Sequence, residues 1–229
     1  MSLIHGIVAY AEGGVHGMQS TQRDWSPFLV HFTSADAMKS VREAVPAGKT
    51  PKEIKELLEA ADKASWKVVE AIAKSGVLRA HVLEGKPTSD PCVSLSECTL
   101  PGLIALCERY GRFGFGFRKK DLFAAGARPC AYLGSTEYAV TKDLAKGEAS
   151  ASAKRRLHDL ANTYVPAGAG GAMRDFTHER EWRLFAHVHL RSRPPEFIVC
   201  PSIYTDKARR LFPKVRQLFP IDVLFEWGA

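Results

Sequence analysis

The alternation of hydrophobic and polar positions predicts short strands and helices along most of the chain. The clearest element is a helix over residues 51–75, where apolar side chains recur at helical spacing. Thr50 precedes it as an N-cap, Glu53 completes a capping box, and Gly76 ends it. The apolar stripe is either part of the core or a face for a partner helix. Because no second long amphipathic helix matches it, we expect core packing.

Shorter elements surround this helix. Period-2 alternation or continuous apolar runs predict strands at residues 28–32, 92–96, 113–118, 129–133, 178–190, 197–200 and 221–227. Further helices are expected up to residue 44, over 99–107 and over 119–125. Residues 142–162 are expected to form a surface helix or a helical pair broken at Gly147, and residues 202–219 a helix that is interrupted or kinked at Pro213. We therefore expect one α+β domain over residues 1–229, with a mixed, mostly antiparallel sheet that is continuous or split. The segment 142–172, with its glycine- and alanine-rich end, is expected to be a mobile insertion.

The strand at 113–118 has an unusual composition. Three phenylalanines alternate with Gly114, Gly116 and Arg118, so one face is bulky and the other is almost bare. A strand omits side chains where another group must come close. The bare face is therefore either a site of tight internal packing or a shelf for an anionic ligand such as a dinucleotide pyrophosphate. The nearby cations Arg109, Arg112, Arg118 and Lys119 suit the second interpretation.

Composition narrows the classes of partner. The 229 residues carry a formal net charge of +7, which favours anionic partners such as nucleotides, nucleic acid or an acidic protein. The five cysteines show no C-x-x-C spacing, so neither a disulfide framework nor a zinc site is predicted. No apolar run approaches the length of a membrane span, and no signal peptide is recognisable. A soluble cytoplasmic protein without membrane contact is expected.

Several catalytic motifs are missing from the sequence. It contains no phosphate-binding G-x-x-x-x-G-K-[ST] loop, no H-E-x-x-H and no G-x-S-x-G. His187 and His189 could supply two metal ligands, but the sequence places no third, so no metal site is predicted.

Two other features could carry chemistry. His31 lies in the middle of a strand and is either a core histidine bonded to a backbone carbonyl or a ligand-binding group. Glu179 and Glu181 lie on one face of a predicted strand, where like charges repel unless cations or a ligand compensate. The pair is either salt-bridged to Arg180 or Arg183, or provides a carboxylate that stabilises positive charge developing on a sugar.

These segments together resemble a known family. The sequences FLVHFTS (28–34), VSLSE (93–97), ERYGRFGFGFRK (108–119) and EREWR (179–183) resemble the AbiGi-type proteins over about residues 28–227. That family consists of antitoxins of abortive phage-resistance systems. The resemblance implies a role in phage defence and a cognate toxin or antitoxin as partner, but it names no reaction.

A second similarity implies a reaction. An early-strand histidine, a central aromatic and basic strand and a late-strand glutamate occur in the same order in NAD-using ADP-ribosyltransferases of the histidine–tyrosine–glutamate and DarT-like kinds. The similarity implies that His31 holds the nicotinamide ribose of NAD and that Glu181 stabilises the oxocarbenium-like transition state, with Tyr110 or Tyr132 at the tyrosine position. Glu179 would position the acceptor, while Gly114, Gly116, Arg118 and Lys119 would receive the pyrophosphate.

Three functions follow as hypotheses. The first is an ADP-ribosyltransferase-like protein with an NAD cleft that joins His31, the glycine strand and Glu181. The second is a non-catalytic antitoxin or interaction module of the same fold, in which that cleft is filled. The third is a nucleic-acid binder that uses the basic patches.

Overall fold

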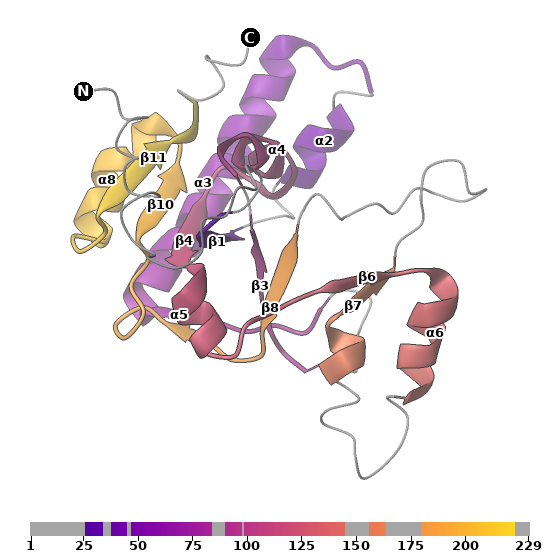
Figure 1. Ribbon diagram of the computed structural model, residues 1–229. Coiled ribbons are helices and arrows are strands. Elements are labelled where there is room, and N and C mark those ends of the chain that lie inside the picture. Colours follow the sequence, from indigo (N-terminus) through magenta and orange to yellow (C-terminus); the bar gives the residue numbers. More distant parts are fainter. Residues whose placement is uncertain are drawn as a thin grey trace.

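The strand predicted at residues 28–32 lies inside the main sheet of the computed structural model, which describes residues 26–33, 38–44, 47–83, 90–97, 99–144, 156–163 and 180–222. This seven-stranded sheet has the order β11-β10-β4-β1-β3-β8-β5 (Figure 1). Its strands are β1 (Phe28–Phe32), β3 (Val93–Ser96), β4 (Gly114–Arg118), β5 (Arg128–Pro129), β8 (Glu181–Leu184), β10 (Phe197–Cys200) and β11 (Gln217–Pro220). All neighbours pair antiparallel except β10 and β11, which are parallel.

Two small sheets accompany the main one. β2 (Val77–Leu78) pairs antiparallel with β9 (Val188–His189), and β6 (Ala131–Leu133) pairs parallel with β7 (Ala161–Thr163). The helices are α2 (Lys39–Ala44), α3 (Pro51–Ser75), α4 (Leu100–Tyr110), α5 (Lys119–Ala124), α6 (Ser135–Leu144) and α8 (Thr205–Leu211). The predicted α+β class, with a mostly antiparallel mixed sheet, is confirmed. In Figure 1, β6, β7 and α6 lie together to one side, away from α8 and β11.

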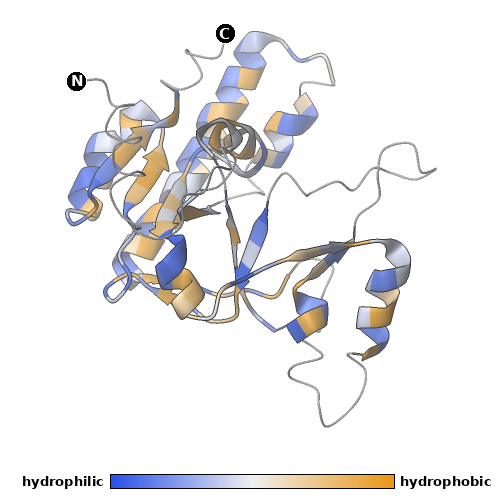
Figure 2. Cartoon of the chain, viewed as in Figure 1, coloured by the Kyte–Doolittle hydropathy of each residue, from blue (hydrophilic) through white to orange (hydrophobic). Residues whose placement is uncertain are grey.

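The long helix α3 has the predicted caps. The Thr50 hydroxyl accepts from the Glu53 backbone N–H, and the Glu53 carboxylate accepts from the Thr50 N–H at 2.9 Å. Gly76 ends the helix in the left-handed conformation, with φ 67°. Trp66, Val69 and Ile72 are buried in the main apolar cluster. The apolar stripe is therefore a core face, as expected, and its alternation with polar positions is visible along α3 in Figure 2.

The two faces of the main sheet pack against different helices. Leu29, Phe115 and Phe117 point toward α3 and belong to the main cluster. On the other face, Val30 and Val199 pack against Leu103 and Cys107 of α4 in a second cluster. Because successive side chains of a strand point to opposite faces, neighbouring residues of one strand pack against different helices, one against α3 and the next against α4.

Five predicted elements differ from the structure. The strand predicted over 129–133 is divided between β5 of the main sheet and β6, which pairs with β7. Residues 221–222 of the strand predicted over 221–227 are helical, and residues 223–227 lie outside the described residues. The helix expected to reach residue 219 ends at Leu211, and residues 217–220 form β11, because the chain breaks at Phe212–Pro213 and then pairs with β10. The strand predicted over 178–190 is divided into β8 and β9, which belong to different sheets. Of the helix expected over 142–162, residues 142–144 are the end of α6, which begins at Ser135, and residues 156–159 are helical, whereas residues 161–163 form β7. Within 142–172, the segment expected to be a mobile insertion, residues 145–155 and 164–172 lie outside the described residues.

Candidate functional site

His31 lies on β1 and points toward α3. Its Nδ1 is 2.8 Å from the Ser94 carbonyl oxygen. Because a carbonyl only accepts, Nδ1 carries the proton and Nε2 keeps a lone pair. Burial, and next the nearby His81, lower the pKa of His31 from its ordinary value, although the bond to Ser94 opposes this. His31 is therefore a neutral imidazole with a fixed tautomer.

This neutral histidine predicts a pH dependence of stability. The unfolded chain takes up a proton near pH 6.5 more readily than the folded protein does, so the contribution of His31 is complete above that pH. It is lost as the pH falls toward the lower folded pKa, at no more than about 1.4 kcal/mol per pH unit. His31→Asn keeps an N–H donor near Ser94 and removes the titration. We expect the free energy of unfolding of the wild type to fall more between pH 7.5 and 5.5 than that of the variant.

The control for this measurement is His189→Asn, because His189 is an exposed histidine. It should keep the wild-type slope. Equal slopes for the wild type and His31→Asn would show that His31 protonates freely in the folded protein.

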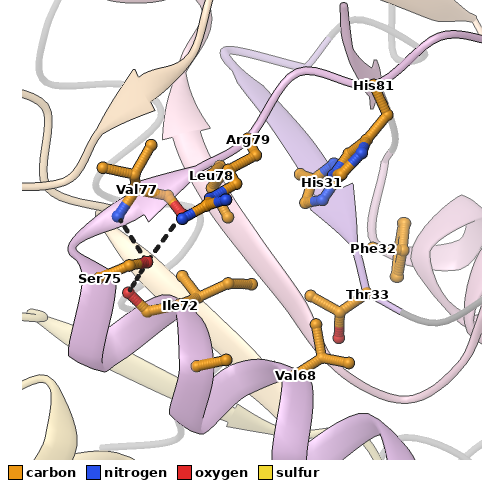
Figure 3. A pocket seen from close by; sticks show the side chains of 11 residues that line it. His31, Phe32, Thr33, Val68, Ile72, Ser75, Val77, Leu78, Arg79 and His81 are labelled. Atoms are coloured by element: carbon orange, nitrogen blue, oxygen red, sulfur yellow. Dashed lines mark hydrogen bonds between the residues drawn. The ribbon is translucent and has the colours of Figure 1, made fainter.

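A pocket of about 510 Å³ opens beside His31 (Figure 3). It lies between α3 and the segments around β1 and β2. Its lining consists of His31, Phe32, Thr33, Val68, Ala71, Ile72, Ser75, Val77, Leu78, Arg79 and His81. Tyr110, Tyr132 and Glu181 are not among these residues.

Glu181 lies at the start of β8 in a separate polar network. Its Oε1 accepts from Nε of Arg183 at 2.8 Å, and its Oε2 accepts from Nη2 of Arg183 at 3.0 Å and from the Asn162 amide at 2.7 Å. Its backbone N–H donates to the Tyr132 hydroxyl at 2.9 Å. Arg183 is 3% exposed, and it also donates to the Asp159 carbonyl oxygen. Burial would lower the pKa of Arg183, but Glu181 raises it overall. The carboxylate thus accepts three hydrogen bonds from donors of its own chain.

The structure does not bring His31 and Glu181 together. In the sheet, Val30 lies opposite Ser96, and Ser96 lies opposite Glu181, so these three side chains share a face. His31, next to Val30, points from the other face. The expectation of one cleft joining His31, the glycine strand and Glu181 is therefore corrected for the described residues. The strand register is the reason, because it places the His31 and Glu181 side chains on opposite faces of the sheet.

The bare face of the glycine strand is occupied by protein. A Cβ on Gly116 would overlap the Phe197 ring of the neighbouring strand, and a Cβ on Gly114 would lie 2.9 Å from Cγ1 of Val30. Gly114 and Gly116 are both buried. Tight internal packing explains the two glycines. The anion shelf expected as the alternative is filled at Gly116 by Phe197.

This packing predicts a steric effect. Gly116→Ala should lower the free energy of unfolding by about 1–3 kcal/mol, because the added methyl group displaces the Phe197 ring. Gly114→Ala should cost less, since its nearest neighbour is the end of the Val30 side chain. Denaturant unfolding of both variants tests this. Adding Phe197→Leu to Gly116→Ala should recover part of the loss, and strictly additive effects would argue against the contact.

The cations near the glycine strand are bound within the chain. Nε of Arg118 donates to Glu196 at 2.6 Å, and Lys119 donates to the buried Glu97 at 2.8 Å. Arg112 forms an ion pair with the buried Asp62. These pairs offset the positive charge that the sequence placed near the strand, and they weaken the case for a pyrophosphate site there.

The remaining predicted residues are dispersed. Tyr110 stacks on Phe32 at a centroid distance of 6.3 Å, and Arg109 lies over the Tyr110 ring. Tyr132 contacts Glu181, so of the two tyrosines it is the one at the glutamate. Glu179 lies outside the described residues.

In the described part of the chain, no third metal ligand joins the two histidines His187 and His189. His187 and His189 are exposed, and Nδ1 of His187 accepts from the Ala80 N–H at 2.9 Å. No group of three or more candidate metal ligands occurs among the described residues. No disulfide joins the described cysteines, which are Cys92, Cys107, Cys130 and Cys200.

Sequence reasoning missed the residues that complete each cluster. Glu97, a buried acceptor for Lys119 and for the Trp182 indole N–H at 3.1 Å, was not singled out. Arg79 and His81 also escaped notice, although they alternate in an extended segment after the end of α3, which places both side chains on one side.

Comparisons with known proteins add no relative. Protein-family models, curated proteins and solved structures were compared with the chain, and none matches. Within the described residues, no helix combines the length and apolar character needed to cross a membrane.

Proposed function

We propose that this chain is a non-catalytic interaction module of an abortive phage-resistance system, with the role of an antitoxin. The proposed role in phage resistance is based on the resemblance of four of its segments to AbiGi-type proteins. One observation carries the choice between module and enzyme: His31 and Glu181 lie on opposite faces of the sheet. A glycosyl transition state needs the ribose-holding group and the carboxylate on one substrate.

Two further observations support the module. The Glu181 carboxylate accepts from three donors of its own chain and is paired with the Arg183 cation, which already offsets the negative charge that a sugar cation would need. The Phe197 ring occupies the space beside Gly116 where a pyrophosphate would have to approach. Both observations support a protein that lacks one continuous NAD cleft through the Gly116 and Glu181 positions.

The test is NAD consumption together with partner binding. The full chain and Glu181→Gln are incubated with labelled NAD, and both hydrolysis and transfer are measured. We expect the same absence of turnover in both. The chain is also co-expressed with the product of the adjacent gene, and co-purification is expected because the proposed interaction module acts by direct contact with its toxin.

NAD turnover by the wild type that is lost in Glu181→Gln would overturn the proposal. It would assign the chain to the NAD-dependent ADP-ribosyltransferases instead. Melting curves of both proteins are needed, since Glu181 also contributes to stability.

A further inference from the structure

The pocket beside His31 combines an apolar wall with a polar rim. α3 contributes Val68, Ala71 and Ile72, and β2 contributes Val77 and Leu78. Figure 3 shows α3 along one side of the pocket and the two histidines at the opposite edge. The volume of about 510 Å³ falls within the range of roughly 300–1,000 Å³ that is usual for small-molecule sites. A bound molecule would bury an apolar body against α3.

Several polar groups in the lining already bond to the protein. His31 through Nδ1, the Thr33 hydroxyl and the Ser75 hydroxyl each donate to a backbone carbonyl, at 2.8, 3.4 and 3.2 Å. These donors are therefore not offered to a ligand. They hold the walls in place.

Arg79 and His81 differ from these groups. Among the described residues that line the pocket, they are the two charged or titratable side chains to which the structure assigns no hydrogen bond. Both are exposed, follow β2 and line the same pocket. Arg79 carries a permanent charge, and its planar guanidinium can bind a carboxylate through two parallel hydrogen bonds.

We propose that this pocket binds a small hydrophobic monocarboxylate, with its carboxylate against Arg79 and His81 and its apolar body against Val68 and Ile72. One arginine at the rim matches one carboxylate. A dinucleotide pyrophosphate would bring more negative charge than this rim offers to neutralise. The site lies on the opposite sheet face from Glu181, so the inference does not rest on the proposed function.

The test uses three probe molecules that distinguish the contribution of the carboxylate charge to binding from that of the apolar ring. 1-Naphthaleneacetate has both, 1-naphthaleneacetamide has the ring without the charge, and acetate has the charge without the ring. Calorimetric titration of the full chain should show binding of naphthaleneacetate and affinity about tenfold lower for the amide, the effect of one charge-assisted contact. Acetate should show no measurable binding. NMR signals of the His31 and His81 rings should shift on titration with naphthaleneacetate.

Substitutions inside and outside the pocket test whether naphthaleneacetate binds at this site. Arg79→Gln should lower the affinity for naphthaleneacetate to that of the amide, and Val68→Trp should block it by filling the mouth. Lys67→Gln, which removes an exposed charge from α3 next to Val68 but outside the lining, should bind as the wild type does. Val68 is 42% exposed and Arg79 is also exposed, so unchanged melting curves are expected. No binding by the wild type, or equal affinity for acid and amide, overturns the proposal, as does wild-type affinity in Arg79→Gln.

Discussion

Trp66→Ala is expected to lower the free energy of unfolding by about 3–5 kcal/mol, the range for removing a large buried aromatic side chain. Trp66 is 7% exposed, and its ring lies 5.9 Å from that of Phe113 and 5.0 Å from that of Tyr204. Its indole N–H donates to Glu70 at 2.7 Å. Truncation would leave a cavity where α3 meets the sheet and the C-terminal strand–helix unit, and these elements cannot close it independently.

Urea unfolding followed by circular dichroism measures this effect, with the midpoint lowered at an unchanged slope. Val68→Ala is the matched control, because Val68 lies on the same helix and is 42% exposed. Its effect should stay within about 0.5 kcal/mol. If Trp66→Ala were as stable as this control, the main packing face of α3 would have to be reassigned.

Glu181→Gln is expected to destabilise the fold by about 3–5 kcal/mol, the cost of breaking a buried ion pair by removing one partner. The Arg183 side chain would stay charged and 4% exposed without its counter-ion. A glutamine amide also offers one oxygen where the carboxylate accepts from three donors, and its NH₂ group would face other donors. The substitution therefore keeps the shape of the side chain but removes its negative charge and part of its capacity to accept hydrogen bonds.

Glu196→Gln is the control for this prediction. Glu196 pairs with Arg118, but the two side chains are 21% and 29% exposed, so its loss should cost at most about 1 kcal/mol. Chemical unfolding of both variants at neutral pH compares the two pairs. Equal small losses would mean that solvent screens the Glu181–Arg183 pair as strongly as it screens the partly buried Glu196–Arg118 pair.

Local sequence signals predicted the elements well where the deciding residues are neighbours. Thr50, Glu53 and Gly76 fix the ends of α3 through bonds within one or two turns, so its bounds could be predicted to the residue. The end of α8 was missed because Gln217–Pro220 pairs with a strand that begins at Phe197, and this pairing outweighs the helical preference of the segment.

The candidate site could not be predicted because it depends on register between distant strands. The phenylalanine–glycine alternation correctly indicated a strand with a bare face. Which group fills that face depends on Phe197, 81 residues after Gly116 in the sequence. Similarly, the order of His31 and Glu181 in the sequence does not tell on which face of the sheet each side chain lies. A shift of one residue in the pairing of β1 with β3 would move His31 to the other face.

The strand order also affects how the protein can fold during its synthesis. β4, in the interior of the sheet, pairs on one side with β1 and on the other with β10, and 78 residues separate the end of β4 from the start of β10. Until residues 197–200 leave the ribosome, one edge of β4 stays unpaired, and the space beside Gly116 stays empty of Phe197. Closing such non-local pairs is slow, because loop entropy must be lost before the contacts compensate. A nascent chain paused before β10 therefore presents an open, aromatic strand edge, which is the state most exposed to aggregation and to capture by chaperones.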